Sequence, residues 1–399
     1  MSQRPARSRR PAAALLAAVA SVLGAACRTS SPAEQRAART TGDVVIAVAW
    51  PWAAHPEIRF GQGLDMAAAE VNASGGIGGR RLRLSRVDDR ESVDSGRLVA
   101  QRLGNDPEVA AVIGHLQSYV TVPAAAAYDE AGLVLVSPTA SDPELTSHAY
   151  TRVFRATFTN RTVGRHMAEY AAAHGYRRVA IYYTRDDYGR GLSNAFEERA
   201  NELGVTTAAR QSYDPGGQST KQTFLSTFEA WHDVDFDALF VAGEVPSAGT
   251  LIAQARKAGI AVPVIGVDAM SSPELMSVGG RDVEGTVVPT VFHVSEPRTE
   301  VRRFTAAFVR RYATEPDAGS ALGYDAVWLL ARAMRQAHSS DPAAVARVLH
   351  ALKGIPGVTG AFSFDSTGDL EDRPLVKTVV QNGQFVYLPD TRQLVAARP

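Results

Sequence analysis

From Asp43 onward, the sequence alternates short apolar, β-rich runs with segments of helical periodicity. The first such run is DVVIAVAW (43–50), and a helical segment over 58–73 follows it, before the turn GGIGG. The same order continues with the runs RLRLSRVD, VAAVIG and LVLVS and with helical segments over 92–103 and 118–131. Apolar strands that alternate with helices are typical of a parallel sheet covered on both faces. The sequence therefore predicts an α/β fold.

A second series of the same kind starts near Asn160. It contains the β-rich runs RRVAIYYT, VTTAARQ, DALFVAG and VPVIGVD and helical segments over 160–174, 189–203 and 247–258. Three more helical segments follow over 300–312, 321–336 and 342–352, and an Asn-Gly pair in PLVKTVVQNGQFVYL predicts a closing hairpin. Since a domain takes roughly 150 residues, the 399-residue chain is predicted to form two doubly wound parallel-sheet lobes.

The composition excludes several classes of protein. Hydrophobic residues make up 45% and charged residues 21%, which fits a globular protein and neither a disordered chain nor a multi-span membrane protein. Lys+Arg and Asp+Glu both total 42, so no overall charge attracts nucleic acid. The nine histidines show no metal-ligand spacing, and no GxSxG, GxxxxGK[ST] or strand-linked GxGxxG motif occurs. We expect no metal, no cofactor, no nucleic-acid partner and no enzymatic activity.

The first 26 residues resemble an export signal. Four arginines precede the apolar run AAALLAAVASVLGAA (12–26), which is shorter than the roughly 20 residues that span a bilayer. The run ends at the single cysteine, Cys27, as in a bacterial lipoprotein box, although Leu23 stands four residues before the cysteine rather than three. The alternatives are a soluble signal with a chance cysteine, or a permanent membrane helix. We expect an exported protein, lipid-anchored at Cys27 or periplasmic, with a flexible tether over 27–42.

Two adjacent acids, Asp88 and Asp89, stand at a strand end, where α/β proteins often place ligand contacts. They could form an acid/base dyad. Adjacent residues on an extended strand point to opposite faces, which favours solvated surface acids instead.

The segment VIGHLQSYVTVPAAAAYDEAGLVLVSPTASDPELT (112–146) carries a family resemblance. Together with GLDMAAAEVNASGGIGGRRL, DDYGRGL, LIAQARKAGI and FSFDSTGDL, it resembles the branched-chain amino-acid (Leu/Ile/Val)-binding proteins, the type I periplasmic solute-binding family of ABC importers. The resemblance covers the chain from residue 43 to about 388.

That resemblance implies the type I periplasmic binding protein fold, with a three-segment hinge between two lobes. Lobe 1 is expected to comprise 43–158 plus 291–365, and lobe 2 to comprise 159–290 plus 366–399. It also implies a small amino-acid-like ligand, an ABC importer permease as the partner, and a monomer. A ligand-sensing module for a separate receptor is a related alternative, and an exported α/β hydrolase is a distant one.

On the first lobe, the resemblance implies that the ligand contacts the segment 139–141 and Ser118. Ser118 and Ser141 match residues that bind the α-carboxylate, and the carbonyl of Thr139, next to Ala140, matches one that accepts from the α-ammonium. Ser118 opens a helix directly after a strand, where free N–H groups favour an anion. The plain alternatives are an N-cap for Ser118 and a turn for Ser141.

On the second lobe, Asp268 matches an acid that pairs with the ligand ammonium, and Tyr188 matches an aromatic residue that closes over the ligand. The alternatives are a helix cap for Asp268 and a loop tyrosine for Tyr188. Glu244 departs from the family, which commonly has an aromatic residue there. An added acid predicts a ligand of more positive or hydrogen-bond-donating character than leucine, unless Glu244 faces solvent or caps the next helix.

Two further departures concern neighbouring segments. The run Trp50-Pro51-Trp52 replaces the usual small residues, which predicts an altered pocket. Glu91 and Gln117 stand where some family members have the two cysteines of a disulfide, and their presence agrees with a single cysteine in the chain.

Overall fold

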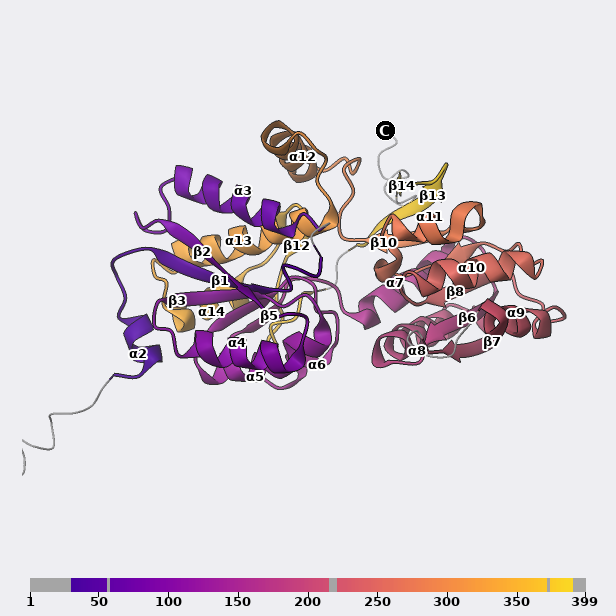
Figure 1. Cartoon of the computed structure of the whole chain (residues 1–399), viewed down its shortest axis with the longest axis horizontal. Coiled ribbons are helices and arrows are strands. Elements are labelled where there is room, and N and C mark those ends of the chain that lie inside the picture. Colours follow the sequence, from indigo (N-terminus) through magenta and orange to yellow (C-terminus); the bar gives the residue numbers. More distant parts are fainter. Residues whose placement is uncertain (1–29, 56–57, 215–220, 372–373, 390–399) are drawn as a thin grey trace, which may run out of the picture.

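A computed structural model describes residues 30–55, 58–214, 221–371 and 374–389. Two sheets with helices packed on both faces form two lobes that lie side by side (Figure 1). The proposed export signal and Cys27 lie outside the described residues. Within the described ranges, no helix combines the length and the apolar character needed to cross a membrane.

The sheet of the first lobe is entirely parallel, in the strand order β2-β1-β3-β4-β5. Its strands are β1 (Val44–Trp50), β2 (Leu82–Asp88), β3 (Val109–Gly114), β4 (Val134–Ser137) and β5 (Val153–Arg155). Every residue of β1, β3 and β4 is buried, which explains their continuous apolar sequences.

Helices cover both faces of this sheet. One face packs against α3 (Phe60–Ala73), α13 (Ala318–Gln336) and α14 (Pro342–Ala351). The other packs against α4 (Val93–Gly104) and α5 (Ser118–Glu130), and the short helix α6 (Glu144–Ser147) follows β4. Helix α12 (Thr299–Tyr312) packs beside α3 and α13, next to the small hairpin of β11 (Ile355–Gly357) and β12 (Gly360–Phe362).

The sheet of the second lobe is mixed, in the order β14-β13-β10-β9-β8-β6-β7. Its parallel strands are β6 (Arg178–Thr184), β7 (Thr206–Tyr213), β8 (Ala238–Ala242), β9 (Val264–Ile265) and β10 (Val287–Thr290). The predicted hairpin adds β13 (Val376–Gln381) and β14 (Gln384–Leu388) as antiparallel edge strands. Asn382 and Gly383 form its turn, both with positive φ, which suits an Asn-Gly pair.

Helices of the second lobe pack in two groups. Helix α7 (Asn160–Ala173) packs on α8 (Asp187–Glu202), and α10 (Ser247–Lys257) packs on α9 (Lys221–Ala230) and α11 (Glu274–Gly279). Two 3-10 helices, η1 (Asp268–Met270) and η2 (Gly280–Val283), flank α11. The core of this lobe is mainly aliphatic and includes packed aromatic rings; Phe196 stacks on Phe240 with ring centroids 4.0 Å apart.

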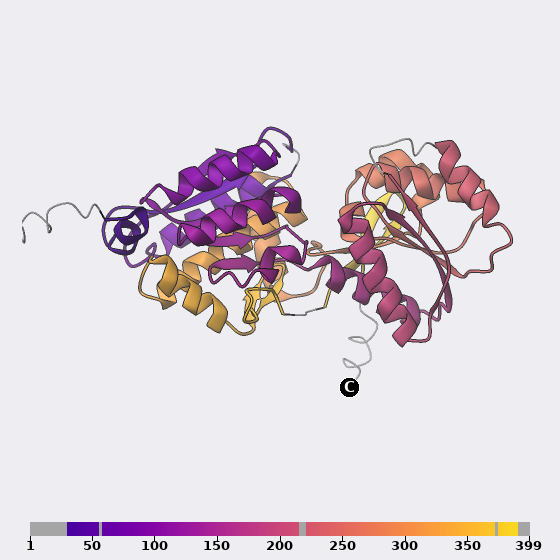
Figure 2. The same cartoon turned by 90° about the horizontal axis from the view of Figure 1, so that it is seen from below.

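The chain passes between the lobes three times. It crosses from β5 to α7, returns from β10 toward α12, and crosses again from Leu370 to β13 (Figure 2). Connections of this kind let two rigid bodies rotate about a narrow joint. The residue limits expected for the lobes stay a prediction.

The segment expected to be a flexible tether carries a docked helix in its described part. Helix α2 (Pro32–Ala37) begins with a capping box between Ser31 and Glu34. Arg36 is only 2% exposed and joins this helix to the first lobe. Its guanidinium donates at 2.7–3.2 Å to the carbonyls of Gly104, Asp106, Val109 and Ala131. The expectation of a flexible tether over 27–42 is therefore wrong for α2, because one buried arginine binds the ends of α4 and α5.

Replacing Arg36 by Ala should lower the free energy of unfolding by about 2 kcal/mol, because two buried and two partly buried carbonyls lose a charged donor. Urea unfolding of the ligand-free protein measures this loss. Gln35→Ala is the control, since Gln35 lies exposed on the same helix. Equal unfolding midpoints for the two variants would mean that the docked helix contributes no stability.

Candidate functional site

Both sheets share one topological feature that positions ligand sites in α/β proteins. In the first sheet β1 lies between β2 and β3, and in the second β6 lies between β7 and β8. Chain connections leave in opposite directions at such points, which opens a crevice outside the carboxyl ends of the strands. Each of these crevices is therefore bordered by loops that follow strands: those after β1 and β3 in the first lobe, and those after β6 and β8 in the second.

On the first lobe, the structure brings Ser118 and Ser141 together. Ser118 is the first residue of α5, as predicted, and its Oγ accepts hydrogen bonds from the backbone N–H of Ser141 at 3.1 Å and of Asp142 at 3.3 Å. The N-cap of α5 is Gln117, so the side chain of Ser118 does not cap its own helix. It ties the loop after β4 to the start of α5 instead.

The N-terminus of α5 keeps unpaired donors. Gln117 makes no side-chain cap, and its amide donates to Glu91 Oε1 at 2.7 Å. Among the described residues, none accepts a hydrogen bond from the backbone N–H of Ser118 or of Tyr119. Free N–H groups and the positive end of the helix dipole favour an anion here.

Polar contacts of the Thr139 side chain and of the Ala140 carbonyl fix the loop that holds these residues. Thr139 Oγ1 donates to the carbonyls of His115 at 3.0 Å and of Leu116 at 2.7 Å. Ala140 is buried, and its carbonyl accepts from Arg155 Nη1 at 2.7 Å. Within the described ranges no residue donates to the carbonyl of Thr139, which leaves this oxygen free to accept from a ligand.

On the second lobe, Tyr188 and Asp268 form a direct contact. Tyr188 lies in the first turn of α8, and its hydroxyl donates to Asp268 Oδ1 at 3.1 Å. Burial raises the pKa of Asp268, and the hydrogen bond from Tyr188 partly opposes that rise. Asp268 is not the N-cap of η1 or α11, whose N-caps are Val267 and Pro273.

Glu244 follows β8 on the same side of the second sheet. The residue is exposed, yet the protein around its carboxyl group raises its pKa, and the charge of Asp186 raises it further. Its backbone carbonyl accepts from Ala248 N at 2.9 Å, but no side-chain cap is formed at the start of α10. Glu244 therefore does not cap α10, and its contact with a ligand stays a prediction.

One electrostatic interaction acts between residues of the two lobes. Burial raises the pKa of Tyr119, and the charges of Glu91, Asp89 and Glu244 raise it further. Tyr119 lies on the first lobe and Glu244 on the second. Tyr119 is 54% exposed, and sequence reasoning missed it. Its place directly after Ser118, as a large aromatic residue in the first turn of α5, was the available signal.

The candidate residues form two sets, one on each lobe, which we call the two walls of the site. No hydrogen bond between described residues joins the set on the first lobe to the set on the second. The first set is Ser118, Thr139, Ala140 and Ser141, and the second is Tyr188, Glu244 and Asp268. A ligand between the walls would supply such links.

A buried polar cluster supports the first wall. His115 Nδ1 lies 2.6 Å from Asp89 Oδ2, and His115 Nε2 lies 3.1 Å from the hydroxyl of Tyr128. All three residues are buried. The interpretation of Asp88 and Asp89 as a solvated pair is wrong for Asp89, since only Asp88 is exposed. The opposite orientation of adjacent strand residues explains the difference.

The two departures from the family pattern, Glu91 with Gln117 and the run 50–52, lie in different surroundings. The Gln117 to Glu91 hydrogen bond occupies the positions of the cysteines in some family members. Trp50 is buried and stacks on Phe60 with ring centroids 3.8 Å apart, so it belongs to the core and not to the site. The indole N–H of Trp52 donates to the carbonyl of Val87 at 3.2 Å. In the part of the chain that the structure describes, no group of three or more His, Cys, Asp or Glu residues could hold a metal ion.

Comparison with known proteins decides the family. Residues 51–384 match the family model described as periplasmic binding protein. The chain belongs to this family. The Leu/Ile/Val-binding protein homolog 1 of Brucella suis is 29% identical over 312 residues, which cover 77% of this chain and 81% of the relative. The Leu/Ile/Val/Thr-binding protein of Salmonella typhimurium is 28% identical over 334 residues, covering 82% and 87%.

Solved structures of periplasmic binding proteins agree. The ABC transporter substrate-binding protein from Desulfitobacterium hafniense, in complex with Leu, is 35% identical with a TM-score of 0.79, covering 87% of this chain and all of that one. The branched-chain amino acid transporter substrate-binding protein from Streptococcus pneumoniae, in complex with isoleucine, is 26% identical with a TM-score of 0.74, over the same shares. The predicted family and the predicted two-lobed α/β fold are confirmed.

Proposed function

We propose that this periplasmic binding protein captures a small amino acid between its lobes and delivers it to an ABC importer. One observation supports the proposal above the others: the backbone N–H of Ser118, after β3 of the first lobe, has no acceptor among the described residues, and the acid Asp268 follows β9 of the second lobe. An α-amino acid carries a carboxylate and an ammonium group that fit these two walls. The relatives named above bind, by their names, amino acids of this type.

The two walls suggest an order of binding. Ser118, Ser141 and the carbonyl of Thr139 lie on one lobe, so the ligand can bind there while the hinge is open. Tyr188, Glu244 and Asp268 lie on the other lobe and reach the ligand only after closure. Contacts made only in the closed form shift the equilibrium toward that form. An importer that recognises the closed form would then receive loaded protein.

The proposed ligand differs from leucine in its side chain. Glu244 adds an acid to the second wall, and an acid that becomes buried on closure is costly unless a donor pairs with it. We therefore favour a polar or basic amino acid, or an amide. The raised pKa of Glu244 fits a carboxyl group that already lacks part of its solvation.

We also propose an exported, monomeric protein, anchored by a lipid at Cys27 or free in the periplasm. If Cys27 carries the anchor, helix α2 leaves only a short linker between the lipid and the docked Arg36. Mass spectrometry of the membrane fraction tests the anchor, since Cys27→Ser should release the protein.

The ligand is best found by a thermal-shift screen of amino acids, amides and small carboxylates, followed by calorimetry. A ligand that binds only the folded state raises the melting temperature. Binding of arginine, polar amino acids or amides above leucine would support the role of Glu244. Tight binding of leucine, with no response to the others, would contradict it while leaving amino-acid capture intact.

Ser118→Ala should weaken the best ligand about tenfold, because one hydrogen bond to a carboxylate is worth about 1.4 kcal/mol. Calorimetric titration gives the dissociation constant. Ser147→Ala is the matched control, since the hydroxyl of Ser147 binds only the carbonyl of Glu144 on the exposed side of α6. Unchanged affinity in Ser118→Ala would remove this residue from the site.

A further inference from the structure

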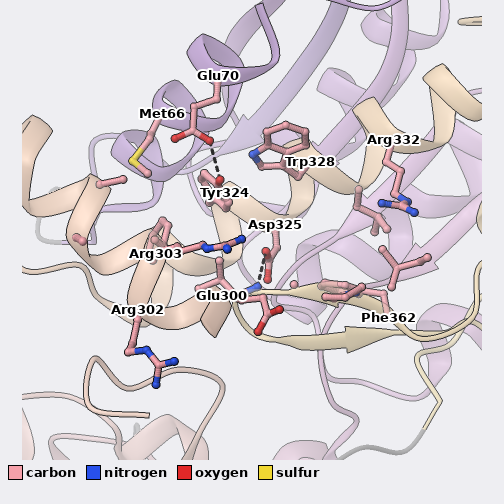
Figure 3. Close-up of a pocket in the computed structure, with 18 of the residues that line it drawn as sticks. Met66, Glu70, Glu300, Arg302, Arg303, Tyr324, Asp325, Trp328, Arg332 and Phe362 are labelled. Atoms are coloured by element: carbon pink, nitrogen blue, oxygen red, sulfur yellow. Dashed lines mark hydrogen bonds between the residues drawn. The ribbon is translucent and has the colours of Figure 1, made fainter. Parts of the chain in front are cut away.

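A large cavity lies within the first lobe, on elements other than those that carry the candidate site. Its volume is about 860 Å³, and it is enclosed by α12, α13 and the hairpin of β11 and β12, with α3 at one end (Figure 3). Small-molecule sites commonly have volumes of about 300–1,000 Å³. None of the predicted amino-acid contacts lines this cavity.

Aromatic rings form much of its wall. Tyr324 and Trp328 project from α13, Phe304 from α12 and Phe362 from β12. The ring centroids of Phe304 and Tyr324 are 4.9 Å apart, and those of Tyr324 and Trp328 are 6.3 Å apart. Rigid rings of this kind offer large apolar contact area to a flat ligand.

Hydrogen bonds hold this wall in place. The hydroxyl of Tyr324 donates to Glu70 Oε2 at 2.7 Å, which fixes the ring toward α3. Asp325 accepts from the backbone N–H of Val358 at 2.9 Å and of Thr359 at 2.7 Å, which fixes the turn of the hairpin. Two of the three acids that line the cavity are therefore already engaged by protein donors.

Arginine side chains outnumber acidic side chains in the lining of the cavity. Five arginines line it against three acids. Two of the arginines are bound to the protein: Arg335 donates to the carbonyls of Val71 and Gly76, and Arg302 donates to that of Pro297. Figure 3 shows Arg302 pointing away from the cavity, whereas Arg303 reaches from α12 toward Asp325.

The other three arginines are uncommitted. Arg303, Arg310 and Arg332 are exposed, and none of them makes a hydrogen bond or an ion pair with another described residue. Free guanidinium groups beside aromatic rings suit a ligand with an apolar body and an acidic group, because arginine forms charge-assisted, bidentate contacts with such groups.

We propose that this cavity is a second binding site, for a small aromatic carboxylate or sulfonate. The aromatic body packs against Tyr324 and Trp328, and the acidic group pairs with the guanidinium group of Arg303 or with that of Arg332, which lie apart on two sides of the cavity (Figure 3). All lining residues belong to elements of the first lobe, so rotation about the hinge leaves the cavity intact. The second site therefore binds its ligand whether or not an amino acid occupies the space between the lobes.

The test uses 8-anilinonaphthalene-1-sulfonate, a fluorescent aromatic anion, and its neutral analogue N-phenyl-1-naphthylamine. Fluorescence titration of the full chain should show saturable binding of the anion. The double variant Arg303→Gln/Arg332→Gln should weaken this binding about tenfold, because it removes the charge-assisted contact with the sulfonate. Affinity for the neutral analogue should not change.

Arg311→Gln/Arg347→Gln is the matched control, because both arginines are exposed and lie outside the lining of the cavity. It removes the same charge and should bind the anion as the original protein does. Ser118→Ala should also bind it unchanged, since this variant alters only the site between the lobes. Thermal unfolding establishes that all variants fold.

Three results would overturn the proposal. The first is binding of the anion that does not saturate, the second is an equal fall in its affinity in both double arginine variants, and the third is a fall in its affinity in Ser118→Ala. The second result would mean a general effect of charge, and the third would place the probe between the lobes. None of these results bears on amino-acid capture, which the thermal-shift screen tests separately.

Discussion

Replacing Asp268 by Asn is expected to weaken binding of the amino-acid ligand about 100-fold. Asparagine keeps the size of the side chain and an oxygen that can accept from the hydroxyl of Tyr188, now at 3.1 Å from Asp268 Oδ1. It removes the negative charge of Asp268, which we propose pairs with the ammonium group of the ligand. Loss of a charge-assisted contact in a closed site costs about 2.7 kcal/mol, which corresponds to the stated factor.

The pH dependence of binding separates this role from a structural one. Burial raises the pKa of Asp268, so its carboxyl group takes up a proton at a higher pH than an ordinary aspartate. The ionised form, present above that pKa, is the one that attracts an ammonium group. Affinity of the original protein should therefore fall on acidification through the raised pKa, and the Asp268→Asn variant should lack this fall.

Stability gives a further check on Asp268. An acid whose pKa is higher in the folded than in the unfolded state destabilises the fold at pH values above both, because folding then disfavours the ionised form. At neutral pH the ligand-free Asp268→Asn variant should be at least as stable as the original protein. Asp235→Asn, at an exposed position, is the control for both measurements. An Asp268→Asn variant with undiminished affinity would refute the proposed ammonium contact.

Local sequence pattern was sufficient for most of the fold. The buried strands β1, β3 and β4 are continuous apolar runs, and the start of α5 at Ser118 was predicted to the residue. The Asn-Gly turn at 382–383 was equally visible, because its two positive φ angles suit those residue types. These features depend on neighbours in the sequence, which is why a single sequence reveals them.

Features that depend on distant partners could not be predicted in this way. Arg36 binds carbonyls 68 to 95 residues away, so its segment has the composition of a tether and yet docks. His115 meets Asp89 across 26 residues, and only that contact shows why Asp89 is buried. Helix α9 was not predicted either, since it buries only Phe224 and Phe228 and lacks a strong apolar stripe.

The same limit applied to the candidate site. The sequence and the family resemblance supplied Ser118, Ser141, Asp268 and Glu244, but only the folded chain showed that the charge of Glu244 on the second lobe helps to raise the pKa of Tyr119 on the first. The resemblance also gave no sign that Trp50, which departs from the family pattern, would pack in the core against Phe60.

The largest expected loss of stability follows the replacement of Arg155 by Met. Arg155 is fully buried in β5, immediately before the first crossing between the lobes. Its Nε donates to Asp369 Oδ1 at 2.7 Å, and its Nη2 donates to Thr146 Oγ1 at 3.1 Å. Methionine fills a similar volume but leaves the carbonyl of Ala140 without the donor Nη1 and Asp369 without its cationic partner.

Removing one partner of a buried ion pair typically costs about 3–5 kcal/mol. Because Asp369 is 20% exposed, we expect a loss at the lower end of that range in urea unfolding. Arg178→Met is the matched control, because Arg178 is half exposed and its ion pair with Asp235 is mostly solvated, so little should change. The double variant Arg155→Met/Asp369→Asn should recover part of the loss, since it removes the unpaired charge as well.

Arg155 also connects stability with ligand binding. Its Nη1 holds the carbonyl of Ala140, next to the proposed ligand contacts Thr139 and Ser141, while Asp369 lies before the third crossing. One guanidinium thus joins the binding loop to two of the three segments that form the hinge. Arg155→Met should therefore weaken ligand binding as well as stability. A variant that loses less than about 1 kcal/mol would show that this buried network does not organise the hinge.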